Sequence, residues 1–175
     1  PVLVNTFLVH LGLATKNPDD TFTFDISKHI LEIAAGTGKF TRNLVDNGWT
    51  DNLAVLEPSK GMLETFNKNF PQIKNQILGS SYKIPLEDNS IDAVIIAQGF
   101  HWFADLDSLK EIYRVLKPQG KLGLIWNFDY ASPSQDSSVA DSEYFNAGTQ
   151  YYNTLNFNLD TNEKVFEQYF DNQQW

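Results

Sequence analysis

The sequence predicts an α/β domain with a doubly wound, mostly parallel sheet and helices on both faces, and two patterns carry this prediction. Short, nearly continuous apolar runs alternate with amphipathic segments along residues 29–128. Strands that are apolar on both faces are typical of parallel sheets, and right-handed crossovers then give a doubly wound topology. The second pattern is a loop of small residues directly after the first apolar run, where such sheets bind ligands.

The apolar runs predict the strands of the sheet, at residues 29–34, 52–57, 75–80, 91–98 and 121–128. Between them, segments with helical periodicity predict helices at residues 39–48, 59–70 and 106–120. Gly48 ends the first helix, and Lys117-Pro118 marks the end of the third. Ser59 and Asp105 are candidate N-caps of the second and third helices.

The two ends of the chain differ from this alternation. Residues 2–14 carry apolar groups on most faces and indicate a buried or docking helix, while residues 21–26 alternate with period two and indicate an extended segment. We expect residues 1–127 to form the core. Residues 128–175 are expected to be a helical and loop extension, either a lid or an incomplete C-terminal part of the same domain, with a short amphipathic helix at 162–170 and no convincing pair of further strands.

Composition excludes several classes of function. The chain has no cysteine, which excludes disulfides, thiolate metal sites and a cysteine nucleophile, and fits a cytoplasmic location. Its formal charge of −9 and the lack of a Lys/Arg cluster argue against nucleic acid as a partner. No run of 18 apolar residues occurs, so no membrane span is expected. We find no metal-ligand spacing, no Ser-His-Asp order and no P-loop, and nothing indicates an oligomeric state.

The stretch "HILEIAAGTGKFT" combines a buried acid with a loop of small residues. Gly36 and Gly38 give a ligand room to approach the backbone, and the free amides of the following helix attract an anion. Glu57 ends the next strand, 19 residues after Gly38, where a carboxylate can accept hydrogen bonds from both hydroxyls of a ribose. The pattern therefore predicts a nucleotide-type site at the carboxyl ends of the strands.

Four motifs in order resemble those of class I S-adenosylmethionine-dependent methyltransferases, over roughly residues 29–127. They read "ILEIAAGTGKFT", "LAVLEPSKGML", "GSSYKIPLEDNSIDAVIIAQGFHWF" and "IYRVLKPQGKLGLIW". The resemblance implies a Rossmann-like methyltransferase fold, with S-adenosyl-L-methionine as the cofactor and the family's last two strands not evident here. The "AQGFHWF" version is similar to the small-molecule, trans-aconitate methyltransferase-like branch.

The resemblance assigns roles near the glycine loop. Glu32 would orient the loop and reach the amino group of the cofactor, often through water. Ala34, Gly36 and Gly38 match the three glycines around the methionine part. Ala34 departs from the family pattern, and alanine is tolerated there at little cost only if its φ is negative. Glu57 matches the acid that binds the ribose.

Further cofactor contacts are implied on the next strands. Pro58 follows the ribose acid, and Met62 would form the apolar side of the adenine slot. Ser80 and Ser81 stand where the family usually has Asp and often Ala, and a hydroxyl can still accept from the adenine amino group. Gln98 corresponds to the position whose backbone faces the methionine moiety. The alternatives are that Met62 is plain core and that the two serines are turn residues.

The segment "GFHWFAD" follows the fourth strand at the mouth of the expected site. His101 is the candidate catalytic base, with a reference pKa near 6.5. Phe100 and Trp102 are expected to line the substrate cavity or touch the cationic sulfonium. We expect His101 and Trp102 beside the methyl-donor end of the site, and the alternative is that both pack the loop against the sheet.

The sequence favours a methyltransferase that acts on a small molecule, with O- or carboxyl methylation ahead of nucleic acid methylation. One alternative is a catalytically inactive binding partner with the same fold. A less favoured one is an NAD-dependent dehydrogenase, whose G-x-G-x-x-G fingerprint needs a third glycine where this chain has Thr41.

Overall fold

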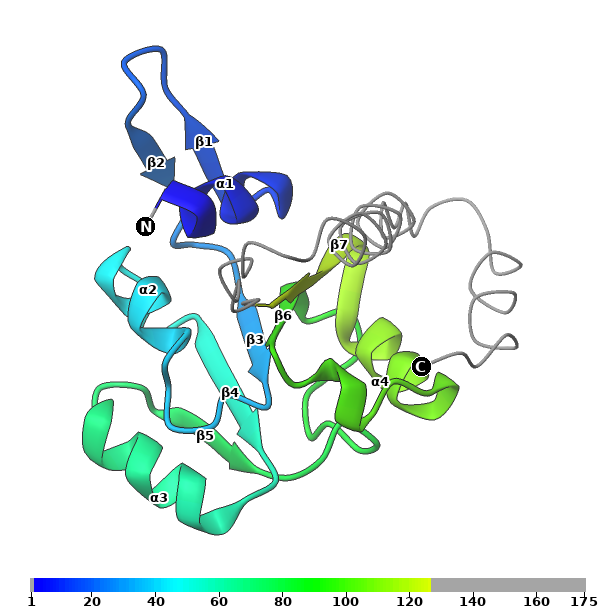
Figure 1. Cartoon of the computed structure of the whole chain (residues 1–175). Coiled ribbons are helices and arrows are strands. Elements are labelled where there is room, and N and C mark those ends of the chain that lie inside the picture. Colours follow the sequence, from blue (N-terminus) through cyan, green and yellow to red (C-terminus); the bar gives the residue numbers. More distant parts are fainter. Residues whose placement is uncertain (1, 127–175) are drawn as a thin grey trace, which may run out of the picture.

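The computed structural model of the protein describes residues 2–126, and its core is a five-stranded parallel sheet (Figure 1). The strand order is β5-β4-β3-β6-β7. The strands are β3 (Ile30–Ile33), β4 (Leu53–Glu57), β5 (Asn75–Leu78), β6 (Ile91–Ala97) and β7 (Leu116–Ile125). The chain runs outward from β3 to β5 and returns to β6 on the other side of β3, so the order reverses between two adjacent strands. The expected doubly wound fold is confirmed.

Helices cover both faces of the sheet because its strands are apolar on both faces. On one face, α1 (Val2–His10), α2 (Thr41–Asp46) and α3 (Lys60–Asn69) pack against the side of β3 that carries Ile30. On the other, α4 (Leu106–Val115) packs against the side that carries Leu31 and Ile33. A short 3₁₀ helix, η1 (Phe100–Trp102), connects β6 to α4.

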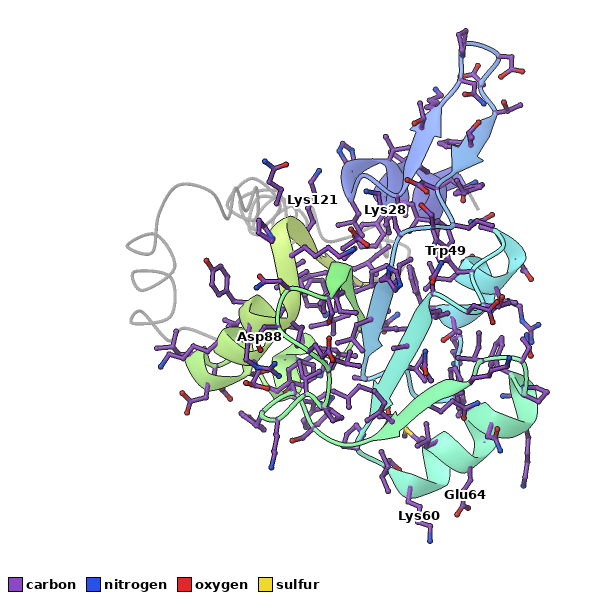
Figure 2. All side chains as sticks on the ribbon, turned by 180° about the vertical axis from the view of Figure 1, so that it is seen from behind. Lys28, Trp49, Lys60, Glu64, Asp88 and Lys121 are labelled. Atoms are coloured by element: carbon purple, nitrogen blue, oxygen red, sulfur yellow. The ribbon has the colours of Figure 1, made fainter. Side chains whose placement is uncertain are left out.

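The N-terminal helix docks on an edge strand, as the sequence indicated, but it is shorter than expected. A side chain at Gly123 of β7 would stand 2.6 Å from the Phe7 ring, so α1 packs closely on that strand. The Lys121 ammonium donates to the carbonyl of His10 at 2.8 Å, and Figure 2 shows Lys121 beside α1. Gly12, with φ of 71°, turns the chain out of the helix, so the prediction of a helix over 2–14 was wrong at its end.

A hairpin follows this turn and projects away from the sheet (Figure 1). It pairs β1 (Ala14–Lys16) with β2 (Phe22–Phe24) in antiparallel register. The period-two alternation predicted the second of these strands and not its partner. None of the helices within residues 2–126 has the length and apolar character that a membrane crossing needs.

The third predicted helix ends before its expected stop at Lys117-Pro118. In the structure α4 ends at Val115, and β7 begins at Leu116, not at Lys121. Two features explain the difference. Pro118 disfavours a helical conformation of the residue before it, and the carbonyl of Val115 is not available to a further helix turn because it accepts from the amide of Ser90 at 2.9 Å. The expected N-caps are confirmed, since the side chains of Ser59 and Asp105 accept from the amides of Met62 and Ser108.

An arginine fastens α4 to the segment that leads into β6. Arg114 makes two 2.9 Å hydrogen bonds to the carboxylate of Glu111, and donates to the carbonyls of Ile84 and Leu86 and to Asp88 (labelled in Figure 2). Glu111 also accepts from the amide of Ile84 at 2.9 Å. The hydrogen bonds from Arg114 lower the pKa of Glu111 to about 2. The arginine of the "IYRVLK" motif is therefore structural.

Replacing Arg114 by Met should lower the free energy of unfolding by about 1.5–3 kcal/mol, because hydrogen bonds to charged groups are lost and Glu111 loses its cation. Urea denaturation at pH 7 measures this. The control is Lys60→Met, which removes an exposed ion pair with Glu64 at 4.0 Å and should change stability by less than about 1 kcal/mol. Equal effects of the two substitutions would contradict a structural role for Arg114.

Candidate functional site

A carboxylate at the end of β4 joins the two loops that begin at the carboxyl ends of β3 and β4. Glu57 is 4% exposed. Its Oε2 accepts from the amide of Gly36 at 2.8 Å, and its Oε1 accepts from the amide of Ser59 at 2.9 Å. Each carboxylate oxygen has a second lone pair, so this arrangement fixes both loops and leaves acceptor capacity for a ligand. Glu57, the residue predicted to bind the ribose, therefore also holds the two loops together. We call its hydrogen bonds to the Gly36 and Ser59 amides the Glu57 brace.

The two glycines of the loop have different structural roles. Both have positive φ, 58° at Gly36 and 90° at Gly38, which favours glycine at each position. A side chain at Gly38 would stand 2.2 Å from the Phe70 ring and 3.1 Å from that of Phe66, so Gly38 gives room to α3 and its end. At Gly36 the nearest atom would be Met62 Sδ at 4.0 Å. Gly36 is therefore the glycine that a ligand can approach.

Met62 and Pro58 flank the same open side. Met62 is 49% exposed, which argues against the alternative that it is plain core. It sits in the first turn of α3, where its amide donates to Ser59 Oγ at 3.4 Å. Pro58 is exposed between the Glu57 brace and this cap. An apolar side chain half open to solvent, next to the bare backbone of Gly36, is suited to contact a flat ring.

The acid inside β3 lies beneath the loop. Glu32 is 1% exposed, and the Thr41 hydroxyl at the start of α2 donates to its Oε2 at 2.7 Å. Burial raises the pKa of Glu32 to about 8, although the Thr41 hydrogen bond opposes this shift. The sequence pattern did not indicate Thr41 as a partner of Glu32. The available signal was a hydroxyl residue near the start of the helix that follows the loop.

Two non-glycine residues beside the loop have a positive φ. Ala34 follows β3 with φ of 57°, and Gln98 follows β6 with φ of 62°. Alanine was expected to be tolerated at position 34 only if its φ is negative, and this is not so. A non-glycine residue in the left-handed conformation lowers the free energy of unfolding by about 1–2 kcal/mol. Gln98 is exposed, and its amide donates to the carbonyl of Ile125 at 2.8 Å. The two residues lie at the ends of adjacent strands, β3 and β6.

The two serines after β5 differ in exposure. Ser80 is exposed and Ser81 is 4% exposed. The carbonyl of Ser80 accepts from the amide of Lys83 at 3.3 Å, which supports a turn there. Next to them, the Tyr82 hydroxyl donates to Asp105 at 2.6 Å. This bond joins the segment after β5 to the start of α4, which the sequence did not indicate.

The aromatic residues after β6 divide between core and surface. Phe100, expected to line the substrate cavity, is 4% exposed and packs against Phe103 with ring centroids 5.8 Å apart. Trp102 is 81% exposed and His101 is exposed, with their ring centroids 5.0 Å apart. The packing alternative for His101 and Trp102 is therefore wrong, and Phe100 fills that structural role.

A second polar cluster lies at the opposite, amino end of the strands. Asp92 accepts from the amide of His29 and from Lys117, both at 2.8 Å, and lies 4.0 Å from Lys28. Although its partial burial opposes ionisation, these partners lower the pKa of Asp92. The cluster is saturated with internal partners. Within residues 2–126, no three His, Asp or Glu side chains gather closely enough to hold a metal ion.

Comparison with known proteins decides the family. A model of the family described as "Methyltransferase domain" matches residues 31–124, which is more than half of the chain. The chain belongs to this methyltransferase domain family. The match contains the glycine loop, the Glu57 brace and η1. The family implies S-adenosylmethionine as the cofactor, and membership argues against the dehydrogenase alternative.

Relatives agree with this assignment. The chain is 49% identical over 108 residues to an uncharacterised methyltransferase-like protein of Schizosaccharomyces pombe, covering 62% of this chain and 41% of the relative. It is 32% identical over 101 residues to a demethylmenaquinone methyltransferase of Chlamydia trachomatis, covering 57% and 44%. The chain therefore spans less than half the length of the curated relatives it matches.

The fold also has solved counterparts. A putative S-adenosyl-L-methionine-dependent methyltransferase of Methanococcus maripaludis superposes with a TM-score of 0.61 at 20% identity, covering 98% of this chain and 73% of the other. At that identity the likeness shows the fold alone.

We expect alanine substitutions at the two glycines of this loop to lower the stability of the protein by different amounts. Gly38→Ala should lower the free energy of unfolding by about 2–4 kcal/mol, because overpacking costs about 1–3 kcal/mol and a left-handed alanine adds about 1. Gly36→Ala should cost about 1–2 kcal/mol from its backbone alone, since its side chain would meet no close neighbour. Thermal or urea unfolding measures both. A larger loss at Gly36 than at Gly38 would contradict the division of roles.

The buried acid predicts a pH dependence of stability. The folded-state pKa of Glu32 is raised from 4.5 to about 8, so its contribution is fully present below about pH 4.5 and is lost as the pH rises through 8. The free energy of unfolding should fall across this window, and Glu32→Gln should flatten the fall. Urea titrations at several pH values measure the slope. The exposed control Glu64→Gln should keep the wild-type slope, and a wild-type slope in Glu32→Gln would refute the assignment.

Proposed function

We propose that this chain is the cofactor-binding part of an S-adenosylmethionine-dependent methyltransferase that acts on a small molecule. The observation that carries the proposal is the Glu57 carboxylate, which holds the Gly36 and Ser59 amides while Gly36 stays open beside Met62. This combination offers an acceptor for ribose hydroxyls, bare backbone for close approach and an apolar side chain for a base.

The residues at the carboxyl edge fit the implied cofactor. Glu57 would hold the ribose, Met62 and Pro58 would contact the adenine, and the exposed Ser80 hydroxyl is available to the adenine amino group. The backbone of Ala34, Gly36 and Gln98 would face the methionine part. Glu32, beneath the loop, would act through Thr41 and the loop backbone, because its side chain is only 1% exposed.

When bound, S-adenosylmethionine supplies a methyl group on a cationic sulfur that a nucleophile displaces directly, with a neutral thioether as leaving group. The protein must then align the nucleophile and exclude water. His101 and Trp102, exposed on η1 after β6, are our candidates for these tasks. His101 would accept the proton of a hydroxyl substrate, and a carboxylate substrate would need no base. Trp102 would cover the substrate.

The substrate class follows from charge and from relatives. The net charge of −9 disfavours DNA and RNA, so we propose O- or carboxyl methylation of a small molecule. The "AQGFHWF" segment supports the trans-aconitate methyltransferase-like branch. The similarity of this region to a demethylmenaquinone methyltransferase supports a small-molecule substrate. A cytoplasmic location fits both.

A catalytically inactive binding partner is the second candidate. Its support is the strained Ala34 in place of a glycine, with φ of 57°, and the two serines at 80 and 81 in place of the usual residues. Both departures would weaken cofactor binding without changing the fold. Calorimetric titration with S-adenosylmethionine separates the candidates, because only the enzyme must bind it.

Glu57→Gln should weaken binding of S-adenosylhomocysteine, because the ribose loses a charged acceptor and the loops lose their brace. A loss of about 1.5–3 kcal/mol corresponds to roughly ten- to hundredfold in Kd. Isothermal titration calorimetry measures it. Glu64→Gln, an exposed acid later on α3, is the matched control and should bind like wild type. Equal affinity of Glu57→Gln and wild type would refute the role of Glu57.

His101→Ala should lower turnover of a hydroxyl substrate by about a hundredfold or more if His101 is the base, while affinity for S-adenosylhomocysteine stays within about twofold. Transfer of a labelled methyl group to candidate small molecules measures turnover. His10→Ala, an exposed histidine on α1, is the control. Unchanged turnover in His101→Ala would remove His101 from the mechanism.

A further inference from the structure

Gly99 is a glycine whose own backbone does not require one. It precedes η1 with φ of −105° and ψ of −16°, a conformation open to any residue. A Cβ built at this position would nevertheless stand 2.7 Å from the Cβ of Ala34, well inside carbon–carbon contact distance. The next atom, Ile96 Cγ2, is 3.7 Å away, which is ordinary contact. The methyl group of Ala34 is thus the single close obstacle to a side chain at 99.

Ala34 cannot move aside easily. Its amide donates to the carbonyl of Leu56 at 2.8 Å, which anchors the residue to β4. Its φ of 57° aims the methyl group in a direction that the usual conformation would not take. A methyl group has no side-chain torsion that could relieve a clash, so any relief must come from the backbone of one of the two loops.

We propose that Ala34 and Gly99 form a steric pair through which Gly99 positions η1 against the glycine loop. The Ala34 methyl group occupies the space that a side chain at 99 would need. The two loops then meet closely enough to bring His101 and Trp102 to the edge where Gly36 is open. Gly99 is a positioning residue that acts through Ala34. This inference rests on the proposed function for its effect on binding.

The pair also restricts which residues can stand together at positions 34 and 99. With alanine at 34, position 99 must be small. With glycine at 34, position 99 could carry a methyl group without the clash. Alanine is therefore expected to be tolerated at either position alone but not at both at once, which a double-mutant cycle can measure.

The test uses the full chain in four forms: wild type, Gly99→Ala, Ala34→Gly and the double variant Ala34→Gly/Gly99→Ala. The probe is S-adenosylhomocysteine, titrated by calorimetry well below the melting temperature, so that affinity is read from folded protein. Thermal unfolding is recorded in parallel. Gly61→Ala is the matched control, because a side chain at Gly61 would meet nothing within 4 Å.

Gly99→Ala should weaken S-adenosylhomocysteine binding by about tenfold or more, since displacement of a site loop by a fraction of an ångström is costly. The double variant should recover affinity to within about threefold of Ala34→Gly and should recover melting temperature. Gly61→Ala should match wild type in affinity and should not lower the melting temperature, since alanine is favoured over glycine within a helix. If Gly99→Ala does not fold, the double variant must still fold and bind.

Three results would overturn the inference: wild-type affinity in Gly99→Ala, no recovery in the double variant, or a double variant that does not fold. A lower melting temperature of Gly99→Ala with unchanged affinity for S-adenosylhomocysteine would mean that Gly99 has a structural role only. Failure of the wild type to bind S-adenosylhomocysteine would overturn the proposed function and the positioning role with it. Recovery of the melting temperature in the double variant would still show whether Ala34 and Gly99 form a steric pair.

Discussion

The carboxylate of Glu57 is the interaction on which the rest of the site depends. It ends β4, it is almost fully buried, and it holds the amides of Gly36 and Ser59 at 2.8 and 2.9 Å. It therefore joins two loops that begin on different strands. An ionised acceptor that organises two amides and keeps lone pairs for a ligand is pre-organised for recognition.

The fold explains why the site lies where it does. The strand order reverses between β3 and β6, so the chain leaves these two strands toward opposite faces, and it is at such a reversal that doubly wound sheets bind ligands. Gly36, Ala34 and Gln98 stand at that edge. The opposite end is closed by Asp92 and its partners, which satisfy one another. One end of the sheet is thus saturated, and the other keeps open backbone and exposed aromatic side chains.

Much of this could be predicted from the sequence because it follows from short-range patterns. Apolar runs identified the parallel strands, and the caps at Ser59 and Asp105 follow from side-chain chemistry. What failed depended on contacts distant in sequence. The end of α4 at Val115 is set jointly by Pro118 and by pairing with the segment before β6. The packing role of Gly38 comes from Phe70, thirty-two residues later. Residues 128–175, where a helical and loop extension was expected as a lid or an incomplete C-terminal part of the domain, lie outside the described part of the chain.

Backbone-amide NMR during titration with S-adenosylhomocysteine tests the central claim most directly, because it reads both ends of the sheet at once. If the ligand binds at the carboxyl ends of the strands, the largest shifts will occur at Gly36, Ser59 and Gln98. The Gly36 and Ser59 amides, already hydrogen-bonded to Glu57, will gain further protection from exchange, while His29 and Asp92 will barely change. Largest shifts at His29 and Asp92, or no shifts at saturating ligand, would contradict that claim.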